Sequence, residues 1–286
     1  MRLPNIGKRK HRMKFTKMEG LGNDYVYVNA LEEDIECDDL SALARKISDR
    51  HFGVGSDGLV LIMGSDRADF RMKMLNSDGS EAEMCGNAIR CVARYVYEKG
   101  LTNQRELEIE TLAGIIRPAI LENGLVRVDM GEPILNGNDI PSLIDKERVV
   151  GEKIAIDGGE MEFTLVSMGN PHAVTFVDDM QFDIETIGPR VENHRLFPNR
   201  INTEFIDVLG RDEVSMRVWE RGAGETMACG TGACAAVVAT CLNDLTDRVV
   251  SVHLLGGDLT IDWDGESNRV YMTGPATFVF EGEYNG

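Results

Sequence analysis

The sequence predicts an α/β fold of two similar halves, each with a central apolar helix surrounded by strands. Short segments in which apolar and polar residues alternate occur throughout the chain, which is typical of half-buried strands. One segment also occurs twice, about half the chain apart, and in both copies a glutamate lies four residues before a Cys-Gly pair. The two copies are Glu81-Ala82-Glu83-Met84-Cys85-Gly86-Asn87 and Glu225-Thr226-Met227-Ala228-Cys229-Gly230-Thr231. A strand-like segment precedes each copy, so we expect two halves of the same architecture.

Strands make up most of the predicted elements. In residues 70–74 and 126–130 every second residue is apolar, so one face of each strand can be buried. Strand-like patterns cover residues 25–28, 59–63, 70–75, 107–111, 126–130, 163–167, 173–177, 215–219, 249–254 and 271–273. The pairs Asn123-Gly124 and Asp264-Gly265 predict hairpin turns between neighbouring strands.

Three segments predict helices. Apolar residues repeat with helical spacing over residues 40–47, with Asp38 or Asp39 as the N-cap. The same spacing covers residues 89–96, and Gly100 is the expected stop signal. Residues 233–242 are small and apolar on almost every side, which predicts a helix buried on its whole circumference.

Composition places the chain among globular proteins. It has 286 residues, of which 43% are hydrophobic and 27% charged, enough for a sizeable core. The net charge of −18 excludes a general affinity for nucleic acid or anionic membranes. No apolar run approaches the roughly 18 residues of a membrane span. We therefore expect neither nucleic acid nor membrane as a partner.

The first twelve residues differ from the rest, because they carry five basic residues and no acidic one. We interpret residues 1–12 as a basic, disordered extension. Residues 131–150 are rich in Gly, Pro, Asn and Asp, which favours a boundary between the halves there. The predicted division is 13–140 for the half carrying Cys85 and 141–286 for the half carrying Cys229.

The six cysteines indicate reduced thiols. The chain is large, shows no secretory signal and contains no Cys-x-x-Cys, so a cytoplasmic location is favoured over a disulfide framework. The five histidines show no paired ligand spacing, so we expect no metal site. A buried cysteine is commonly a small hydrophobic residue, and this is the interpretation of the four cysteines outside the repeat: Cys37, Cys91, Cys234 and Cys241.

Cys85 and Cys229 are different because each is expected at the start of a helix. The positive end of the helix dipole lowers the pKa of a thiol, and the free N–H groups of the first turn can hold a carboxylate. Two such thiols facing one another suit inversion at an amino-acid α-carbon. One thiolate removes the α-proton, and the other thiol delivers a proton to the opposite face.

Weaker signals surround these cysteines. Residues 53–58 fit Gly-x-Gly-x-x-Gly but follow a helix and precede a strand, so they predict a turn rather than a dinucleotide site. His172 is placed where it could tune a thiol, and Glu220-Arg221 lies just before the second cysteine loop. Asn23, Asn76 and Asn202 are turn formers by default.

Taken together, these motifs resemble the diaminopimelate epimerase family. The resemblance runs from Met13 to about Glu283. Its motifs are Met18-Glu19-Gly20-Leu21-Gly22-Asn23-Asp24-Tyr25, Asn76-Ser77-Asp78-Gly79-Ser80, Met84-Cys85-Gly86-Asn87, Met168-Gly169-Asn170-Pro171-His172, Glu220-Arg221-Gly222-Ala223-Gly224-Glu225-Thr226, Ala228-Cys229-Gly230-Thr231-Gly232 and Met272-Thr273-Gly274-Pro275-Ala276.

The resemblance implies two pseudo-symmetric halves, each a β-barrel-like sheet around a central helix, closing over the substrate. It implies interconversion of LL- and meso-2,6-diaminopimelate in lysine and peptidoglycan precursor biosynthesis, with no pyridoxal phosphate or metal, in a homodimer. Cys85 and Cys229 match the catalytic bases, and His172 and Glu220 match residues that tune the thiols. Matches to substrate-binding positions are Asn23, Asn76, Gly86, Asn87, Asn170, Asn202, Glu220, Arg221, Gly230 and Thr231.

The chain departs from the family pattern at one position, and two other functions are alternatives to the epimerase. Some relatives carry a ligand-contacting Gln where this chain has Gly58, so that contact is lost or replaced. A proline or hydroxyproline racemase would use the same thiol chemistry, but its substrate would not need Arg221 with several asparagines. A redox protein in which Cys85 and Cys229 cross-link is the third reading, and the absence of Cys-x-x-Cys counts against it.

Overall fold

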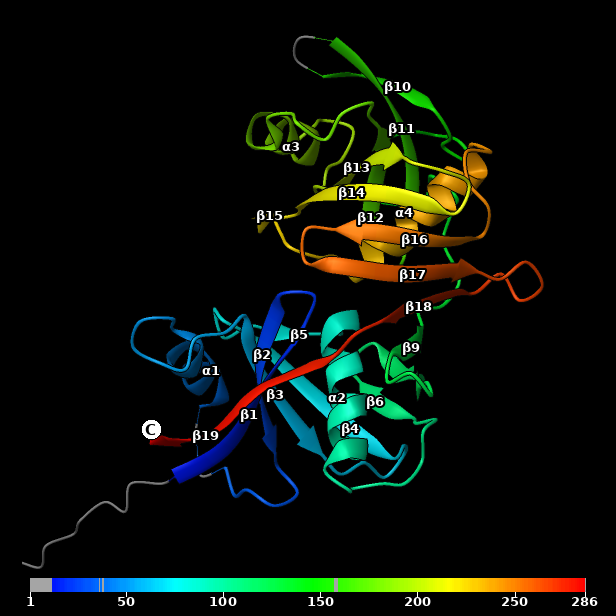
Figure 1. Ribbon diagram of the computed structural model, residues 1–286. Coiled ribbons are helices and arrows are strands. Elements are labelled where there is room, and N and C mark those ends of the chain that lie inside the picture. Colours follow the sequence, from blue (N-terminus) through cyan, green and yellow to red (C-terminus); the bar gives the residue numbers. More distant parts are fainter. Residues whose placement is uncertain (1–11, 36, 38, 157–158, 286) are drawn as a thin grey trace, which may run out of the picture.

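The computed structural model describes residues 12–35, 37, 39–156 and 159–285. Within this part of the chain the strands form two mixed sheets: the first lies in the lower half of the view in Figure 1, and the second fills the upper half and reaches the lower half at β9. The first sheet has the order β19-β1-β2-β3-β4-β6-β7, and β5 pairs with β4. Its strands are β1 Arg12–Gly20, β2 Asn23–Asn29, β3 Gly58–Met63, β4 Phe70–Asn76, β5 Glu81–Ala82, β6 Ile109–Thr111, β7 Gly114–Ile116 and β19 Thr277–Asn285.

The second sheet has the order β10-β11-β12-β13-β14-β16-β17-β18-β9-β8, and β15 pairs with β14. Its strands are β8 Pro118–Ile120, β9 Val126–Asp129, β10 Glu152–Ile156, β11 Gly159–Ser167, β12 Pro171–Phe176, β13 Asn202–Val208, β14 Glu213–Glu220, β15 Gly224–Glu225, β16 Val249–Leu254, β17 Gly257–Trp263 and β18 Val270–Gly274. The described helices are α1 Leu40–Ser48, α2 Gly86–Glu98, α3 Ile184–Glu192 and α4 Gly230–Leu242.

The two sheets repeat one arrangement. In the first, β2 is parallel to β3, β3 is antiparallel to β4, and β4 is parallel to β6. In the second, β12 is parallel to β13, β13 is antiparallel to β14, and β14 is parallel to β16. Each parallel pair is joined through a helix, with α1 and α2 in the first half and α3 and α4 in the second. The predicted pair of similar halves is therefore confirmed.

The helices that follow the two cysteines lie in a shared core. One cluster of buried apolar side chains contains residues of both α2 and α4, including Ile89, Val92, Val237 and Val238. α2 is amphipathic, whereas α4 is buried along almost its whole length, as its uniformly apolar sequence predicts. Because both helices belong to one core, their first residues are held in fixed positions.

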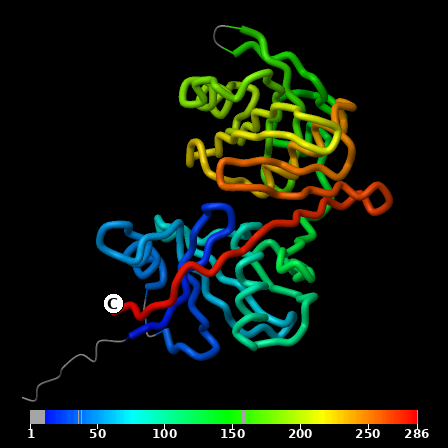
Figure 2. The backbone as a smooth tube through the Cα atoms, viewed as in Figure 1, coloured from blue at the N-terminus to red at the C-terminus, as the bar shows by residue number. Residues whose placement is uncertain are grey.

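The second sheet reaches into the first half. β8 and β9 pack against α2 (Figure 1), and β9 pairs with β18 of the second sheet. β19 then pairs with β1 of the first sheet, so the red end of the chain lies beside its blue start in Figure 2. We propose a division at residues 140/141, because it gives each half one cysteine of the repeated segment, Cys85 or Cys229, and the helix that follows it.

The predicted helices and hairpins are confirmed, with adjusted ends. α1 has Asp39 as its N-cap, and its side chain accepts a hydrogen bond from the Ala42 amide. α2 ends before Gly100, whose φ of 71° is left-handed. The strand predicted at residues 107–111 begins only at Ile109. α3 has no counterpart among the predicted helices, because it is short and contains Pro189.

The extension predicted at residues 1–12 lies outside the described residues except for Arg12, which is the first residue of β1. Among the helices of the described residues, none is long and apolar enough to cross a membrane.

Candidate active site

Cys85 and Cys229 are the N-cap residues of α2 and α4, as the repeated segment predicts. Both have an extended backbone, and the free amides of the first helical turn follow them directly. The glycine after each cysteine packs against Met272 of β18. A Cβ atom on Gly86 would lie 2.8 Å from the Met272 Cε, and one on Gly230 would lie 2.9 Å from its Sδ. The two helix N-termini therefore meet at one methionine, which places both cysteines in one site.

The first cysteine lies beside two asparagines. The Cys85 thiol donates to the Asn23 Oδ1 at 3.3 Å, and the Asn87 Nδ2 donates to the same oxygen at 3.4 Å. Asn23 begins β2 and Asn87 lies in the first turn of α2. The Asn87 Oδ1 is buried and has no hydrogen-bond partner among the described residues. A hydrogen-bond donor of a bound molecule would satisfy this atom.

The second cysteine is connected to a chain of polar groups that leads from half-buried residues to fully buried ones. The Cys229 sulfur lies 3.5 Å from the Thr231 Oγ1, which accepts a hydrogen bond from the Asn170 Nδ2 at 3.2 Å. The Asn170 Oδ1 lies 3.0 Å from the His172 Nε2, and the His172 Nδ1 lies 2.7 Å from the Glu204 Oε1. Thr231, Asn170 and His172 thus link the Cys229 thiol to the carboxyl group of Glu204 inside the protein.

His172 and Glu204 share a proton in this chain. Both side chains are fully buried. With the Asn170 amide as oriented, its oxygen accepts from the His172 Nε2–H, so the proton between Nδ1 and Glu204 belongs to one partner or the other. Burial raises the pKa of Glu204 against the opposing effect of His172.

A third group of predicted residues lies at the ends of β13 and β14. The Asn202 Oδ1 accepts from the Arg221 amide at 2.8 Å, and its Nδ2 donates to the Pro171 carbonyl. Glu220 accepts from the Thr226 hydroxyl at 2.5 Å. The Arg221 guanidinium is exposed and donates to the Asn199 carbonyl at 3.1 Å. This cation is therefore accessible to a carboxylate in solution.

Among the described residues, the Asn76 side chain forms no hydrogen bond to another predicted site residue. It ends β4, and its Nδ2 donates to the Ser80 hydroxyl at 3.0 Å. Its register partner is Gly58. A Cβ atom on Gly58 would lie 2.1 Å from the Leu75 carbonyl oxygen, so this backbone has no room for a glutamine side chain. Position 58 supplies no side-chain contact here.

The two halves touch beside the second cysteine loop. Leu21 and Gly22 form the turn between β1 and β2, and Gly256 lies in the turn between β16 and β17. The Gly256 amide donates to the Met227 carbonyl at 2.8 Å. A Cβ atom on Gly256 would lie 2.0 Å from the Leu21 carbonyl oxygen. Only a residue without a side chain allows the two turns to approach this closely.

The pKa of each active-site thiol is raised, although the helix N-terminus alone predicts a lowered value. Burial is the largest cause for Cys85, and the amides of Ala88 and Asn87 oppose it. For Cys229, burial and then the charges of Glu220 and Glu204 raise the pKa well above its usual range. The sequence prediction of a lowered pKa was wrong, because a sequence does not show how deeply a thiol is buried.

Alkylation should reveal these raised pKa values. The thiolate is the reactive form, so iodoacetamide should react slowly with both thiols at neutral pH and about tenfold faster for each added pH unit. The profile of Cys229 should level off at a higher pH than that of Cys85. Residue-resolved mass spectrometry of the reduced chain gives both profiles. A plateau below pH ~8.5, the value of an ordinary thiol, would contradict this expectation.

The cysteines outside the repeat follow the structural interpretation in part. Cys91 and Cys234 are fully buried in the core, and burial raises the pKa of each to about 12. Cys37 and Cys241 are only half-buried. All six cysteines are free. Among the described residues, no group of three or more His, Cys, Asp or Glu side chains lies close enough together to hold a metal ion.

Two residues of the site were missed by the sequence analysis. Glu204 is fully buried in β13, but polar residues such as Thr203 and Asp207 occur in the same strand, so the sequence alone does not mark it out. Met272 belongs to a motif that was noted, but no pattern places it between the two helices.

Comparison with known proteins decides the family. The family model described as "Diaminopimelate epimerase" matches residues 15–136 and 164–279. The chain belongs to the diaminopimelate epimerase family. It is therefore an isomerase. A diaminopimelate epimerase of Acetivibrio thermocellus is 60% identical over 276 residues, covering 95% of this chain and 98% of the relative. One from Methanococcus maripaludis strain S2 is 56% identical and covers 95% and 99%.

Solved structures at low sequence identity share the fold of this family. A Bacillus anthracis phenazine biosynthesis protein of the PhzF family matches with a TM-score of 0.66 at 19% identity, over 96% of this chain and 99% of that protein. A hydroxyproline epimerase from Agrobacterium vitis matches with a TM-score of 0.65 at 15% identity, over 96% and 91%. The expected fold of two pseudo-symmetric halves is confirmed.

Proposed function

We propose that this chain interconverts LL- and meso-2,6-diaminopimelate with Cys85 and Cys229 as the two acid–base groups. The observation that carries the proposal is the pair of N-cap cysteines whose helices begin at one methionine. Each thiol is followed by free helix amides, which suit the carboxylate next to the reacting carbon. Membership of the diaminopimelate epimerase family supports the substrate. The product would feed lysine and peptidoglycan precursor synthesis.

In the first step the thiolate on one face takes the α-proton. Negative charge then grows on the substrate carboxylate, and the amides at residues 86–87 and 230–231 stabilise it. The thiol on the other face gives its proton to the α-carbon, which inverts the centre. Roles reverse in the return reaction. The mechanism needs no pyridoxal phosphate and no metal, because the helix amides stabilise the carbanion-like charge.

The remaining predicted residues have proposed roles at the two ends of the substrate. The exposed Arg221 guanidinium binds the distal carboxylate. Asn23, Asn76, Asn170 and Asn202 bind polar groups of the substrate. His172 and Glu220 tune the thiols. The charge of Glu220 raises the pKa of both thiols, which fits a position near both.

Proton NMR of LL-diaminopimelate in D2O tests the function. With reduced protein, chelator and no added cofactor, the α-proton signal should disappear while the meso isomer appears. No exchange with both thiols confirmed as reduced would overturn the substrate assignment. Proline and hydroxyproline, tested in parallel, separate the racemase alternative. If the α-proton of none of the three compounds exchanges, the redox alternative is favoured.

We also propose a cytoplasmic homodimer. The six free thiols suit a reducing compartment. β19 is the edge strand of the first sheet, and it exposes two large apolar side chains, Val279 at 54% and Phe280 at 46%. An exposed apolar edge strand favours pairing with a second chain.

Phe280→Lys should therefore halve the mass measured by light scattering after size exclusion. Val249→Lys changes an equally exposed valine in the other sheet and should leave the mass unchanged. A monomeric wild-type chain would contradict the dimer.

A further inference from the structure

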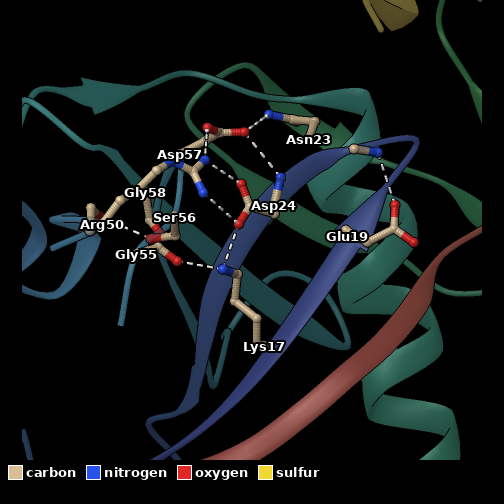
Figure 3. Close-up of polar contacts among 11 residues, drawn as sticks. Lys17, Glu19, Asn23, Asp24, Arg50, Gly55, Ser56, Asp57 and Gly58 are labelled. Carbon is tan, nitrogen blue, oxygen red and sulfur yellow. Dashed lines mark hydrogen bonds and ion pairs between the residues drawn. The ribbon is translucent and has the colours of Figure 1, made fainter. Parts of the chain in front are cut away.

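The turn at residues 53–58 places the Asp57 carboxylate beside Asn23, whose side chain contacts Cys85. Asp57 lies next to Asn23 (Figure 3), and its Oδ2 accepts from the Asn23 Nδ2 at 2.8 Å. The Asp57 amide donates to the Asp24 carbonyl, and its carbonyl accepts from the Ser77 amide. Gly55, with φ of +82°, allows the turn that brings the aspartate to this position. The glycine-rich segment therefore has a neighbour in the active site.

The contact with Asp57 fixes which way the Asn23 amide points. A carboxylate only accepts hydrogen bonds, so the NH2 group of Asn23 must face Asp57. Its oxygen then faces the other way, where it accepts from the Cys85 thiol at 3.3 Å. If the amide group were rotated by half a turn, its NH2 group instead of its oxygen would face the Cys85 sulfur. These two orientations favour opposite protonation states of Cys85.

Asp57 is itself held by charged and backbone groups. Its Oδ2 also accepts from the Asp24 amide at 3.0 Å, and its Oδ1 accepts from the Arg50 Nη2 at 2.9 Å. Arg50 also contacts the Asp24 carboxylate at 2.8 Å, and buried Lys17 contacts it at 2.5 Å. Two cations thus neutralise two carboxylates, and every Asp57 oxygen of the side chain has a donor.

Lys17 and Arg50 also keep Asp24 charged. Burial alone would raise the pKa of Asp24, but hydrogen bonds from Arg50 and Lys17 lower it. Figure 3 shows Arg50 between the two carboxylates and Lys17 reaching both Asp24 and the Gly55 carbonyl. Asp57, whose carboxylate orients Asn23, is therefore held by Arg50, and Arg50 is held in turn by the charged Asp24.

We propose that Asp57 is a positioning residue for Cys85: it locks the Asn23 amide with its oxygen toward the sulfur and so holds this cysteine as a protonated thiol in the substrate-free protein. The proposal rests on the proposed role of Cys85. In Asp57→Asn, the single side-chain oxygen accepts from Arg50 or from Asn23 but not from both. The Asn23 amide is then no longer held in one orientation.

The test is the pH profile of Cys85 alkylation, resolved by mass spectrometry, in a cycle of four chains: wild type, Asp57→Asn, Asn23→Ala and the double variant. Asp57→Asn should increase the alkylation rate of Cys85 near neutral pH on the order of tenfold, because N–H groups can now face the sulfur. The rate at Cys229 should stay unchanged. In the Asn23→Ala background, Asp57→Asn should have no effect on Cys85.

Two outcomes would overturn the proposal. One is an Asp57→Asn variant whose Cys85 alkylation profile equals that of wild type. The other is an Asp57→Asn effect of the same size with and without the Asn23 amide, because the Asp57 charge would then act on Cys85 without the amide. Asp66→Asn, an exposed charge-matched control, should match wild type. If Asp57→Asn does not fold, NMR of the wild-type Asn23 side-chain amide decides. Slow hydrogen exchange supports the lock, and exchange at the rate of a free amide overturns it.

The profile is measured without substrate, so it does not depend on epimerisation. An Asp57→Asn effect in a chain inactive on diaminopimelate would overturn the proposed function and support the positioning role.

Discussion

Replacing either Cys85 or Cys229 by alanine should reduce epimerisation of diaminopimelate by ~10²–10⁴-fold in both directions, the usual contribution of one acid–base group. Both thiols are required because each serves one face of the α-carbon. The remaining thiol can still remove a proton and return a deuteron on its own face. Each variant should therefore exchange the α-proton of one isomer without inverting it.

The NMR assay in D2O measures exchange and inversion separately. The isomer that exchanges should differ between Cys85→Ala and Cys229→Ala, which also assigns each thiol to its stereoisomer. Cys37→Ala removes a half-buried thiol outside the site and should keep wild-type turnover. Wild-type inversion by either active-site variant would contradict the two-base mechanism.

Gly256→Ala should lower kcat/KM by about 100-fold while the chain stays folded. The new Cβ would lie 2.0 Å from the Leu21 carbonyl oxygen, so the two turns must separate by about 1 Å. These turns belong to different halves and touch next to Met227, two residues before Cys229. Displacing one half relative to the other misaligns the thiol of one half with a substrate held by the other.

Gly265→Ala is the matched control, because a Cβ there meets only the Arg248 side chain at ordinary contact distance. Steady-state kinetics and the thermal midpoint of both variants give the comparison. If Gly256→Ala keeps wild-type kcat/KM, the contact between the turns does not align the site.

The sequence predicted the features that repeat or alternate. Cys85 and Cys229 could be placed at helix starts because a glutamate, a glycine and an apolar helical pattern recur around both. The buried helix α4 followed from its uniformly apolar residues. These signals depend only on residues that are near one another in the sequence, so they can be recognised without the folded structure.

What the sequence left open depends on distant contacts. Met272 meets Gly86 and Gly230 only after β18 is paired in the second sheet. The raised thiol pKa values follow from burial by residues far along the chain. Glu204 appeared as one acidic residue among many, and its contact with His172 depends on the parallel pairing of β12 with β13.

The return of β19 to β1 has a consequence for the order of events at the ribosome. β1 leaves the exit tunnel long before its partner β19, so Arg12 can pair with Asn285 only after all the residues between them have been synthesised. Until then the outer edge of β1 lacks its neighbour, and closing so long a loop is slow. The exposed edge is a surface that chaperones could bind, and the first sheet can be completed only after β19 has been synthesised.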